Sequence, residues 1–395
     1  MRHRMLIAAT AATFAGLTSM VGITTAGAAP SQLAQLHSVR VCNASSSGYA
    51  TCMSVVRTDA AGKPLATTTP SGLGPANIQS AYKLAGSTSG GRTVAIVDAY
   101  NDPTAEADLA TYRATYGLAA CTTANGCFRK IDQRGGTSYP AKNGGWAQEI
   151  SLDLDMVSAT CPDCHILLVE ADSSSFANLG TAVNTAATIS GVAAISNSYG
   201  GGDAADTTYG TYYNHPGIAV TASTGDSGYV GGSYPASSSY VTAVGGTSLK
   251  TAANTRGWTE TVWSGAGSGC STYNVALAAA ATADTGCVKR AMADVSAVAD
   301  PNTGVAVYDS TAYKGSSGWM VFGGTSASAP IIGSVYALSG NTSGYANAVP
   351  YSHTSALFDV TSGSNGTCPT SQWCTARVGW DGPSGLGTPN GVSAF

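Results

Sequence analysis

Continuous runs of apolar and β-branched residues recur along the chain and alternate with stretches of helical periodicity. Such runs are typical of strands that are buried on both faces of a sheet. We expect strands at 93–100, 166–171, 192–199, 218–223 and 240–245. Helices are expected at 103–116, 145–159 and 176–188, with another beginning near Ser326. The alternation predicts an α/β fold with a mostly parallel central sheet flanked by helices on both sides.

The carboxyl ends of the strands are the part of such a sheet where active groups collect. Asp98, Tyr199 and Asp226 stand at or just beyond the ends of expected strands. We therefore expect these three residues near a functional site.

The N-terminal part of the chain changes in composition twice. Arg2 and Arg4 precede an apolar stretch that ends in the small-residue run 26–29, which is typical of a secretory signal peptide. A membrane anchor is the alternative, although Thr and Gly interrupt the stretch. We interpret residues 1–28 as a signal peptide, 29–70 as a short propeptide or linker, and 71–395 as one large domain. The protein is thus expected to be secreted and extracellular, without a membrane partner.

Ten cysteines fall in five close pairs along the sequence. Local disulfides are the simplest account of such pairs in an exported protein. Cys161 and Cys164 are also compatible with a redox or zinc pair, but no second pair stands at metal-site spacing. The expected pairs are Cys42 with Cys52, Cys121 with Cys127, Cys161 with Cys164, Cys270 with Cys287, and Cys368 with Cys374.

Charged residues make up only 10% of the chain, and the formal net charge is -4. This composition argues against a basic nucleic-acid surface or a polybasic membrane patch. We expect a monomer with no nucleic-acid partner.

The motif Gly-Gly-Thr-Ser-Ala-Ser-Ala-Pro at 323–330 places Ser326 at the start of an apolar helix. Free backbone N–H groups and the positive dipole end of a helix stabilise the negative charge that develops in acyl transfer. Ser326 is therefore a candidate nucleophile. The alternative is an ordinary helix cap formed by Thr325 or Ser326.

A nucleophilic serine needs a base, and three histidines lie beyond residue 70. His165 leads into an apolar strand, His215 precedes a proline, and His353 lies in a Ser/Thr-rich loop. None is followed by the Gly-Thr of a subtilisin-type histidine. A triad of Asp98, His165 and Ser326 stays open as an alternative, because the chain order allows it.

Glu149 and Asp153 are better candidates because they stand four residues apart in an expected helix and share one face. In a common pocket the two carboxylates would hold a proton between them, which raises one pKa and suits a base that works in acid. The alternative is a solvated acidic helix face.

Gly-Asp-Ser-Gly at 225–228 follows the expected strand 218–223. The same letters surround the nucleophile of chymotrypsin-like enzymes, which would make Ser227 catalytic. Those enzymes are all-β and need an upstream Ala-Ala-His-Cys segment, and the sequence has neither feature. A protonated Asp226 would instead donate a hydrogen bond to an oxyanion.

Together these residues resemble the sedolisin family of serine-carboxyl peptidases. The resemblance runs from about Gly72 to the C-terminus and includes the order of the motifs. It implies a subtilisin-like fold, activity in acid, a Glu149, Asp153, Ser326 triad, and Asp226 in the oxyanion hole. Family precursors usually carry a propeptide of domain size, so the short segment 29–70 departs from the family pattern.

The resemblance also assigns supporting residues. Asp98 stands where some members carry a Glu that hydrogen-bonds the triad Asp. Tyr199, Gly200 and Gly201 match a strand beside the substrate cleft, where glycine lets a peptide backbone approach closely.

A calcium site is implied near the C-terminus, with one ion bound by hard oxygen ligands. A turn-rich tail with two solvated Asp residues is the alternative. The implied ligands are the carboxylates of Asp359 and Asp381 and the carbonyls of Val360, Arg377 and Gly379.

The sequence thus predicts a secreted, acid-acting serine-carboxyl peptidase, either an endopeptidase or a tripeptidyl peptidase, with protein or peptide substrates. Two alternatives are a neutral hydrolase that uses His165 and an inactive exported binding protein on the same fold.

Overall fold

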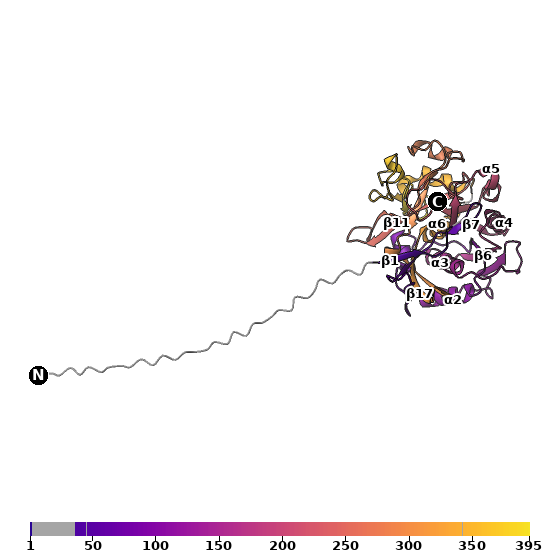
Figure 1. The fold of residues 1–395 in the computed structure, drawn as a ribbon, viewed down its shortest axis with the longest axis horizontal. Helices are drawn as coiled ribbons and strands as arrows, with labels where there is room; N and C mark the ends of the chain where they lie inside the picture. Colours follow the sequence, from indigo (N-terminus) through magenta and orange to yellow (C-terminus); the bar gives the residue numbers. More distant parts are fainter. Residues whose placement is uncertain (2–35, 45, 342) are drawn as a thin grey trace. The chain divides into compact units, whose positions relative to one another are not determined.

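The apolar runs of the sequence form an eight-stranded sheet at the centre of the computed structural model, which describes residues 1, 36–44, 46–341 and 343–395. The strand order is β12-β11-β9-β7-β4-β6-β5, and β15 also pairs with β11. All neighbours are parallel except β11 and β12. The expected mostly parallel sheet is therefore confirmed (Figure 1). Its strands are β4 (Thr93–Ala99), β5 (Phe128–Asp132), β6 (His165–Ala171), β7 (Val192–Asn197), β9 (Ala219–Ser223), β11 (Thr242–Thr251), β12 (Trp258–Val262) and β15 (Val295–Val298).

Four of the five expected strands correspond to β4, β6, β9 and β11. The expected strand at 192–199 is instead divided at Ser198, where the chain leaves the central sheet. β7 ends at Asn197, and β8 (Tyr199–Gly202) belongs to a second sheet. The Ser198 hydroxyl donates to Asp153 Oδ1 at 2.9 Å, which ties this break to the helix that carries Asp153.

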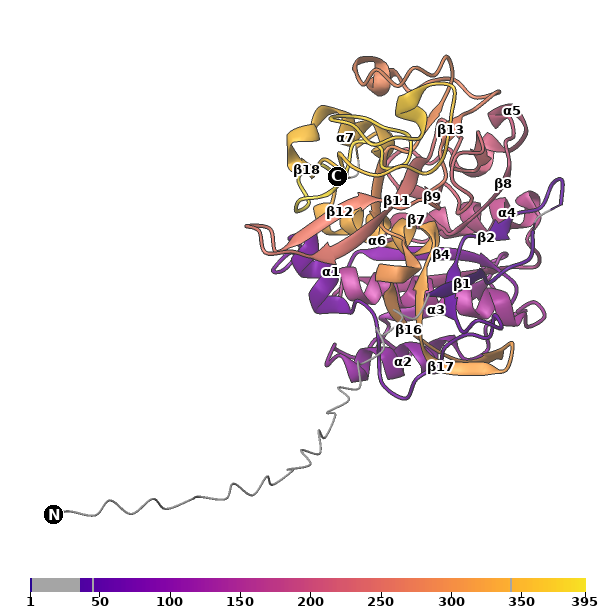
Figure 2. The ribbon, with the colours of Figure 1, turned by 60° about the vertical axis from the view of Figure 1, so that its left-hand side comes forward.

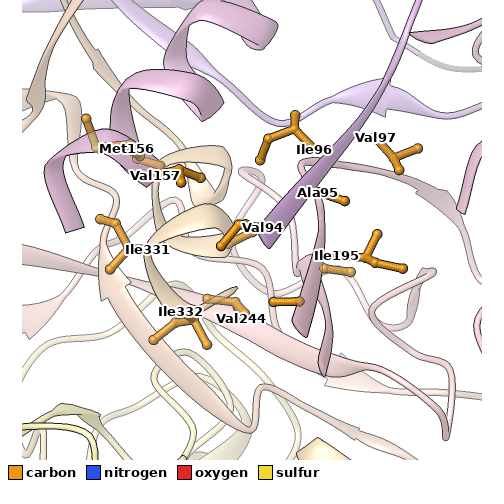
Figure 3. Close-up of a cluster of buried hydrophobic side chains, with 14 of the residues drawn as sticks. Val94, Ala95, Ile96, Val97, Met156, Val157, Ile195, Val244, Ile331 and Ile332 are labelled. Carbon is orange, nitrogen blue, oxygen red and sulfur yellow. The ribbon is translucent and has the colours of Figure 1, made fainter. Parts of the chain in front are cut away.

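The expected helices correspond to α2 (Ala105–Thr115), α3 (Gly144–Thr160), α4 (Phe176–Ala187) and α6 (Thr325–Ser339). α3 begins after Asn143, whose side chain accepts hydrogen bonds from two backbone N–H groups of the first turn. α3 and α6 pack against each other and the sheet, and α4 packs on β4, β6 and β7. Figure 3 shows Met156 and Val157 of α3 and Ile331 of α6 beside Val94 of β4.

The segment that precedes the main α/β region is part of the fold. β1 (His37–Arg40) and β3 (Val55–Thr58) join β17 (Ser316–Gly323) and β16 (Val305–Tyr313) in a four-stranded sheet. β2 (Thr51–Cys52) pairs with β8, which also pairs with β10 (Ser233–Tyr234). The indigo strands β1 and β2 lie among elements from much later in the chain (Figure 2). The expected signal peptide lies outside the described residues, and the boundary at residue 70 stays a prediction.

The five expected disulfides are all present, including the one between Cys161 and Cys164. No described helix has both the length and the hydropathy that a bilayer-spanning helix needs. The remaining helices and strands are α1 (Pro75–Ala81), α5 (Asp206–Tyr209), α7 (Val349–Ser352), β13 (Gly269–Cys270), β14 (Ala291–Met292), β18 (Leu357–Phe358) and β19 (Thr388–Pro389). The 3-10 helices are Gly210–Tyr212, Ala278–Thr282, Pro301–Thr303, Ala346–Ala348, Thr354–Ala356 and Ser371–Trp373.

Candidate active site

Ser326 is the second residue of α6, and its side chain is fully buried. Its backbone N–H donates to the Met53 carbonyl oxygen at 2.9 Å, and its hydroxyl donates to the Ser198 carbonyl oxygen at 3.2 Å. Gly324 precedes the helix with a φ of 93°, a conformation that favours glycine. A Cβ at Gly324 would also collide with the Met53 carbonyl oxygen. Gly324 therefore lets a backbone carbonyl approach the N-terminus of α6.

Glu149 lies on α3 beside Ser326, and it is 0% exposed. Burial raises the pKa of Glu149 to about 8, although the nearby hydroxyls of Ser326 and Ser54 lower it. Neither carboxylate oxygen has a partner of standard hydrogen-bond geometry among the described residues. Glu149 is thus a buried carboxyl group next to the candidate nucleophile, which is where a general base has to lie.

Asp153 and Asp98 continue this group of carboxyl groups into the protein. Both are fully buried. Burial raises the pKa of Asp153, and the charges of Asp98 and Glu149 raise it further. The pKa of Asp98 is raised by burial and then by the charges of Glu149 and Glu170. Such closely placed carboxyl groups cannot all be ionised, so they share protons.

Glu170 was not expected from the sequence. It lies opposite Asp98 in the pairing of β4 with β6, and it accepts from Lys130 Nζ at 2.9 Å. Burial raises the pKa of Glu170 to about 7. Glu170 stands at the carboxyl end of the expected strand 166–171, which was the available signal.

Asp226 follows β9 and faces the start of α6. Its Oδ1 accepts from the Thr325 N–H at 2.8 Å and from the Thr325 hydroxyl at 3.0 Å. Its Oδ2 is buried and has no partner among the described residues. Burial raises the pKa of Asp226 to about 6. In acid this carboxyl group is neutral, and Oδ2 has a proton to donate beside the Ser326 N–H.

The histidine alternative does not fit this arrangement. His165 is exposed and pairs with Thr93 at the first residues of β6 and β4, whereas Asp98 pairs with Glu170 near the opposite ends of these strands. Five residues of strand separate the two levels by about 16 Å. His165 and Asp98 therefore lie at opposite ends of two neighbouring strands.

The expected substrate strand lies in β8. The Tyr199 side chain is fully buried, and its hydroxyl donates to Asn197 Oδ1 at 2.7 Å, while its backbone pairs with Cys52. A Cβ on Gly201 would lie 2.8 Å from the Tyr49 carbonyl oxygen. The backbone that approaches β8 this closely is the chain's own N-terminal segment.

Asp359 and Asp381 come together in the C-terminal loop. Asp359 Oδ2 accepts from the Gly379 N–H at 2.8 Å, and Asp381 Oδ2 accepts from the Arg377 N–H at 3.2 Å. Burial raises the pKa of Asp381 to about 7, and the charge of Asp359 adds to this. The Arg377 guanidinium binds Asp284 instead. The donor set consequently fits a cation, although no group of three or more His, Cys, Asp or Glu side chains suited to a metal occurs in the described part.

Backbone oxygens are available at the same place. The carbonyls of Val360, Arg377 and Gly379 accept no hydrogen bond from the described residues. Hard oxygen ligands of this kind suit calcium.

No protein-family model matches the sequence. The chain is 29% identical over 368 residues to kumamolisin from Bacillus sp.. The aligned region covers 82% of this chain and 63% of that protein. It is 37% identical over 111 residues to tripeptidyl-peptidase sed1 from Aspergillus fumigatus, over 26% of this chain and 16% of that protein. The chain thus spans less than two thirds of the length of these curated relatives.

The fold is similar to that of Pseudomonas sedolisin, a serine-carboxyl proteinase solved with two molecules of pseudo-iodotyrostatin. The TM-score is 0.68 at 24% identity, covering 82% of this chain and 96% of that one. This likeness confirms the subtilisin-like fold.

Proposed function

We propose that this chain, a member of the sedolisin family of serine-carboxyl peptidases, hydrolyses peptide bonds in acid with Ser326 as nucleophile and Glu149 as general base. The observation that carries the proposal is the group of buried carboxyl groups beside Ser326. Oxygens of Asp98, Glu149, Asp153 and Asp226 lack partners among the described residues. A fold keeps several such groups only where they have a use, because each costs about 1–3 kcal/mol.

The proposed reaction begins when Ser326 Oγ attacks the peptide carbonyl carbon and Glu149 takes the hydroxyl proton. Asp153 shares its proton with Glu149 and orients it, and Asp98 supports Asp153 by the same sharing. The Ser326 N–H and the protonated Asp226 hold the oxyanion. Glu149 then gives its proton to the leaving amine, and a water molecule hydrolyses the acyl-enzyme by the reverse steps.

The proposed acid optimum follows from Asp226. Its pKa is raised to about 6, so the carboxyl group donates a hydrogen bond below that pH and is ionised above it. An ionised Asp226 would repel the oxyanion. Activity should therefore be high in acid and fall as the pH rises through about 6.

We also infer that the C-terminal loop binds one calcium ion through Asp359, Asp381 and the free carbonyls. The ion would offset the charge of two close carboxylates and hold the loop in shape.

We also propose that the protein is secreted and monomeric. Five disulfides are consistent with an oxidising compartment.

Digestion of casein at about pH 4 tests the proposed function, because the Asp226 carboxyl group is protonated there and can donate to the oxyanion. We expect peptide products from the wild type and none from Ser326→Ala. Ser227→Ala is the control and should still digest casein, because Ser227 is exposed and its hydroxyl contacts Arg40 and not the buried carboxyl groups. Undiminished digestion by Ser326→Ala would contradict the assignment.

A further inference from the structure

Residues 41–56 lie across the candidate active site as a peptide substrate would. β2 pairs antiparallel with β8, with Thr51 opposite Gly200 and Cys52 opposite Tyr199. The next residue, Met53, donates its N–H to the Ser198 carbonyl oxygen at 3.0 Å. Adding a strand to a sheet edge is a general mode of peptide recognition.

The carbonyl group of Met53 occupies the position of a reacting carbonyl. Its oxygen accepts from the Ser326 N–H at 2.9 Å. A Cβ on Gly324 would collide with this oxygen and would lie 2.8 Å from Asp226 Oδ2, so both oxyanion donors are next to the Met53 oxygen. The hydroxyl of Ser54, the following residue, lies close enough to Glu149 to affect its pKa.

The same segment closes the site to other peptides. Ser326 is 0% exposed, and Met53 and Ser54 are 6% and 0% exposed. Arg40 Nη2 also donates to the Ser227 hydroxyl at 2.6 Å, which fixes β1 over the Asp226 loop. An external substrate cannot place its carbonyl on the Ser326 N–H while the Met53 carbonyl is there.

We propose that the Met53–Ser54 bond is a processing site that Ser326 cleaves within its own chain, and that the residues before Ser54 keep the enzyme closed until then. This inference rests on the proposed function. It moves the end of the propeptide-like segment from about residue 70 to Met53.

The reaction balances as a hydrolysis. Ser326 Oγ bonds to the Met53 carbonyl carbon while its proton passes to Glu149. The carbon–nitrogen bond to Ser54 breaks, and the Ser54 amine takes the proton from Glu149. Water then attacks the Met53 ester and gives one proton to Glu149, which returns it to Ser326 Oγ, and Met53 leaves as a carboxylic acid that keeps the second proton of the water.

The pocket around the Met53 side chain indicates which residues can precede the cleaved bond. The Met53 methyl carbon lies 3.0 Å from a Cβ built on Gly200 and 3.9 Å from one built on Gly225. A cavity of about 310 Å³ adjoins it, lined in part by Met53, Gly200, Gly225 and Val230. A long, unbranched apolar side chain fits this space.

The path of the segment before Met53 bears on the kind of peptidase. The chain continues beyond Thr51, and the Ala50 N–H donates to the Ser174 carbonyl oxygen at 2.8 Å. The cleft thus holds more than three residues before the cleaved bond. This path favours an endopeptidase over a tripeptidyl peptidase.

Mass spectrometry of the full-length protein, denatured at intervals after a shift to about pH 4, tests the processing site at a pH where Asp226 carries the proton that it donates to the oxyanion. We expect a new N-terminus at Ser54, a fragment ending at Met53, and no cleavage in Ser326→Ala. Met53→Asp should slow cleavage about tenfold or more, since a carboxylate is costly in this pocket. Ser47→Asp, an exposed change in the same disulfide loop, should be cleaved at the wild-type rate.

A casein assay on the same samples separates this inference from the proposed function. Casein digestion by a protein that still carries Met53 joined to Ser54 would overturn the processing site and leave the peptidase intact. A new N-terminus at another position alone would do the same. A protein that neither digests casein nor cleaves itself would contradict the proposed function as well.

Discussion

At the scale of residues, the site is defined by carboxyl groups that are buried in the fold. Glu149 and Asp153 lie four residues apart on α3, so their common face follows from helical spacing. Their electrostatic interaction with Asp98 links α3 to the end of β4, which spacing alone cannot predict. Burial is the largest cause of the raised pKa in each of these three groups.

Asp226→Asn keeps a hydrogen-bond donor at the oxyanion site but removes the group that titrates. An amide donates a hydrogen bond at every pH, whereas the wild-type carboxyl group loses its proton as the pH rises through about 6. We expect the high-pH limb of kcat/KM to move to higher pH in Asp226→Asn. Asp226→Ala, which has no donor, should lose about 10²–10³-fold in kcat. An Asn variant with the wild-type limb would contradict the role of Asp226.

At the scale of elements, long apolar runs were predictable and short polar strands were not. β4, β6 and β9 are buried in the central sheet, so their sequences carry a continuous apolar signal. β1 and β3 are short, and β3 pairs with β17 from the far end of the chain. Pairing between segments so distant in sequence leaves no local pattern. This is why no strands were predicted in the segment 29–70, which was interpreted as a propeptide or linker.

The stability of the C-terminal loop should depend on calcium. Calcium should raise the Tm of Ser326→Ala protein and a chelator should lower it, by about 2 °C or more, because a bound ion stabilises only the folded loop. Differential scanning calorimetry at pH 6 to 7 measures the shift without reference to activity.

Asp381→Asn should abolish the calcium effect on Tm. Asp284→Asn is the matched control, since Asp284 is exposed and, among the described residues, its carboxylate binds only the Arg377 side chain. A calcium shift of equal size in Asp381→Asn would rule out this site.

At the scale of the whole molecule, buried carboxyl groups should make the folded protein more stable in acid than in base. Burial raises the pKa of several carboxyl groups, five of them to values between about 6 and 8, so in weak acid the folded protein binds more protons than the unfolded chain. The pKa values are about 8 for Glu149 and Asp309, about 7 for Glu170 and Asp381, and about 6 for Asp226. The stability from these groups is complete below the ordinary carboxyl pKa near 4 and is lost as the pH rises through the folded values.

Thermal unfolding should therefore occur at a lower temperature in weak base than in acid. We expect the Tm of Ser326→Ala protein, which cannot digest itself, to fall by at least about 5 °C between about pH 4 and pH 8. Circular dichroism in calcium-free buffer measures this difference. A Tm that rises over the same interval would mean that these carboxyl groups are ionised in the folded protein.

The pH dependence of kcat/KM in wild type and Glu149→Gln tests the carboxylate base most directly. Mass spectrometry should record the fraction of each protein that has lost the residues before Ser54, and the rate should refer to that fraction, so that the N-terminal segment does not distort either value. We expect a wild-type maximum in acid with a fall above about pH 6, and a loss of about 10²–10⁴-fold in Glu149→Gln with folding unchanged. Wild-type turnover by Glu149→Gln, or full wild-type activity at about pH 8 with a loss below about pH 5, would contradict the account.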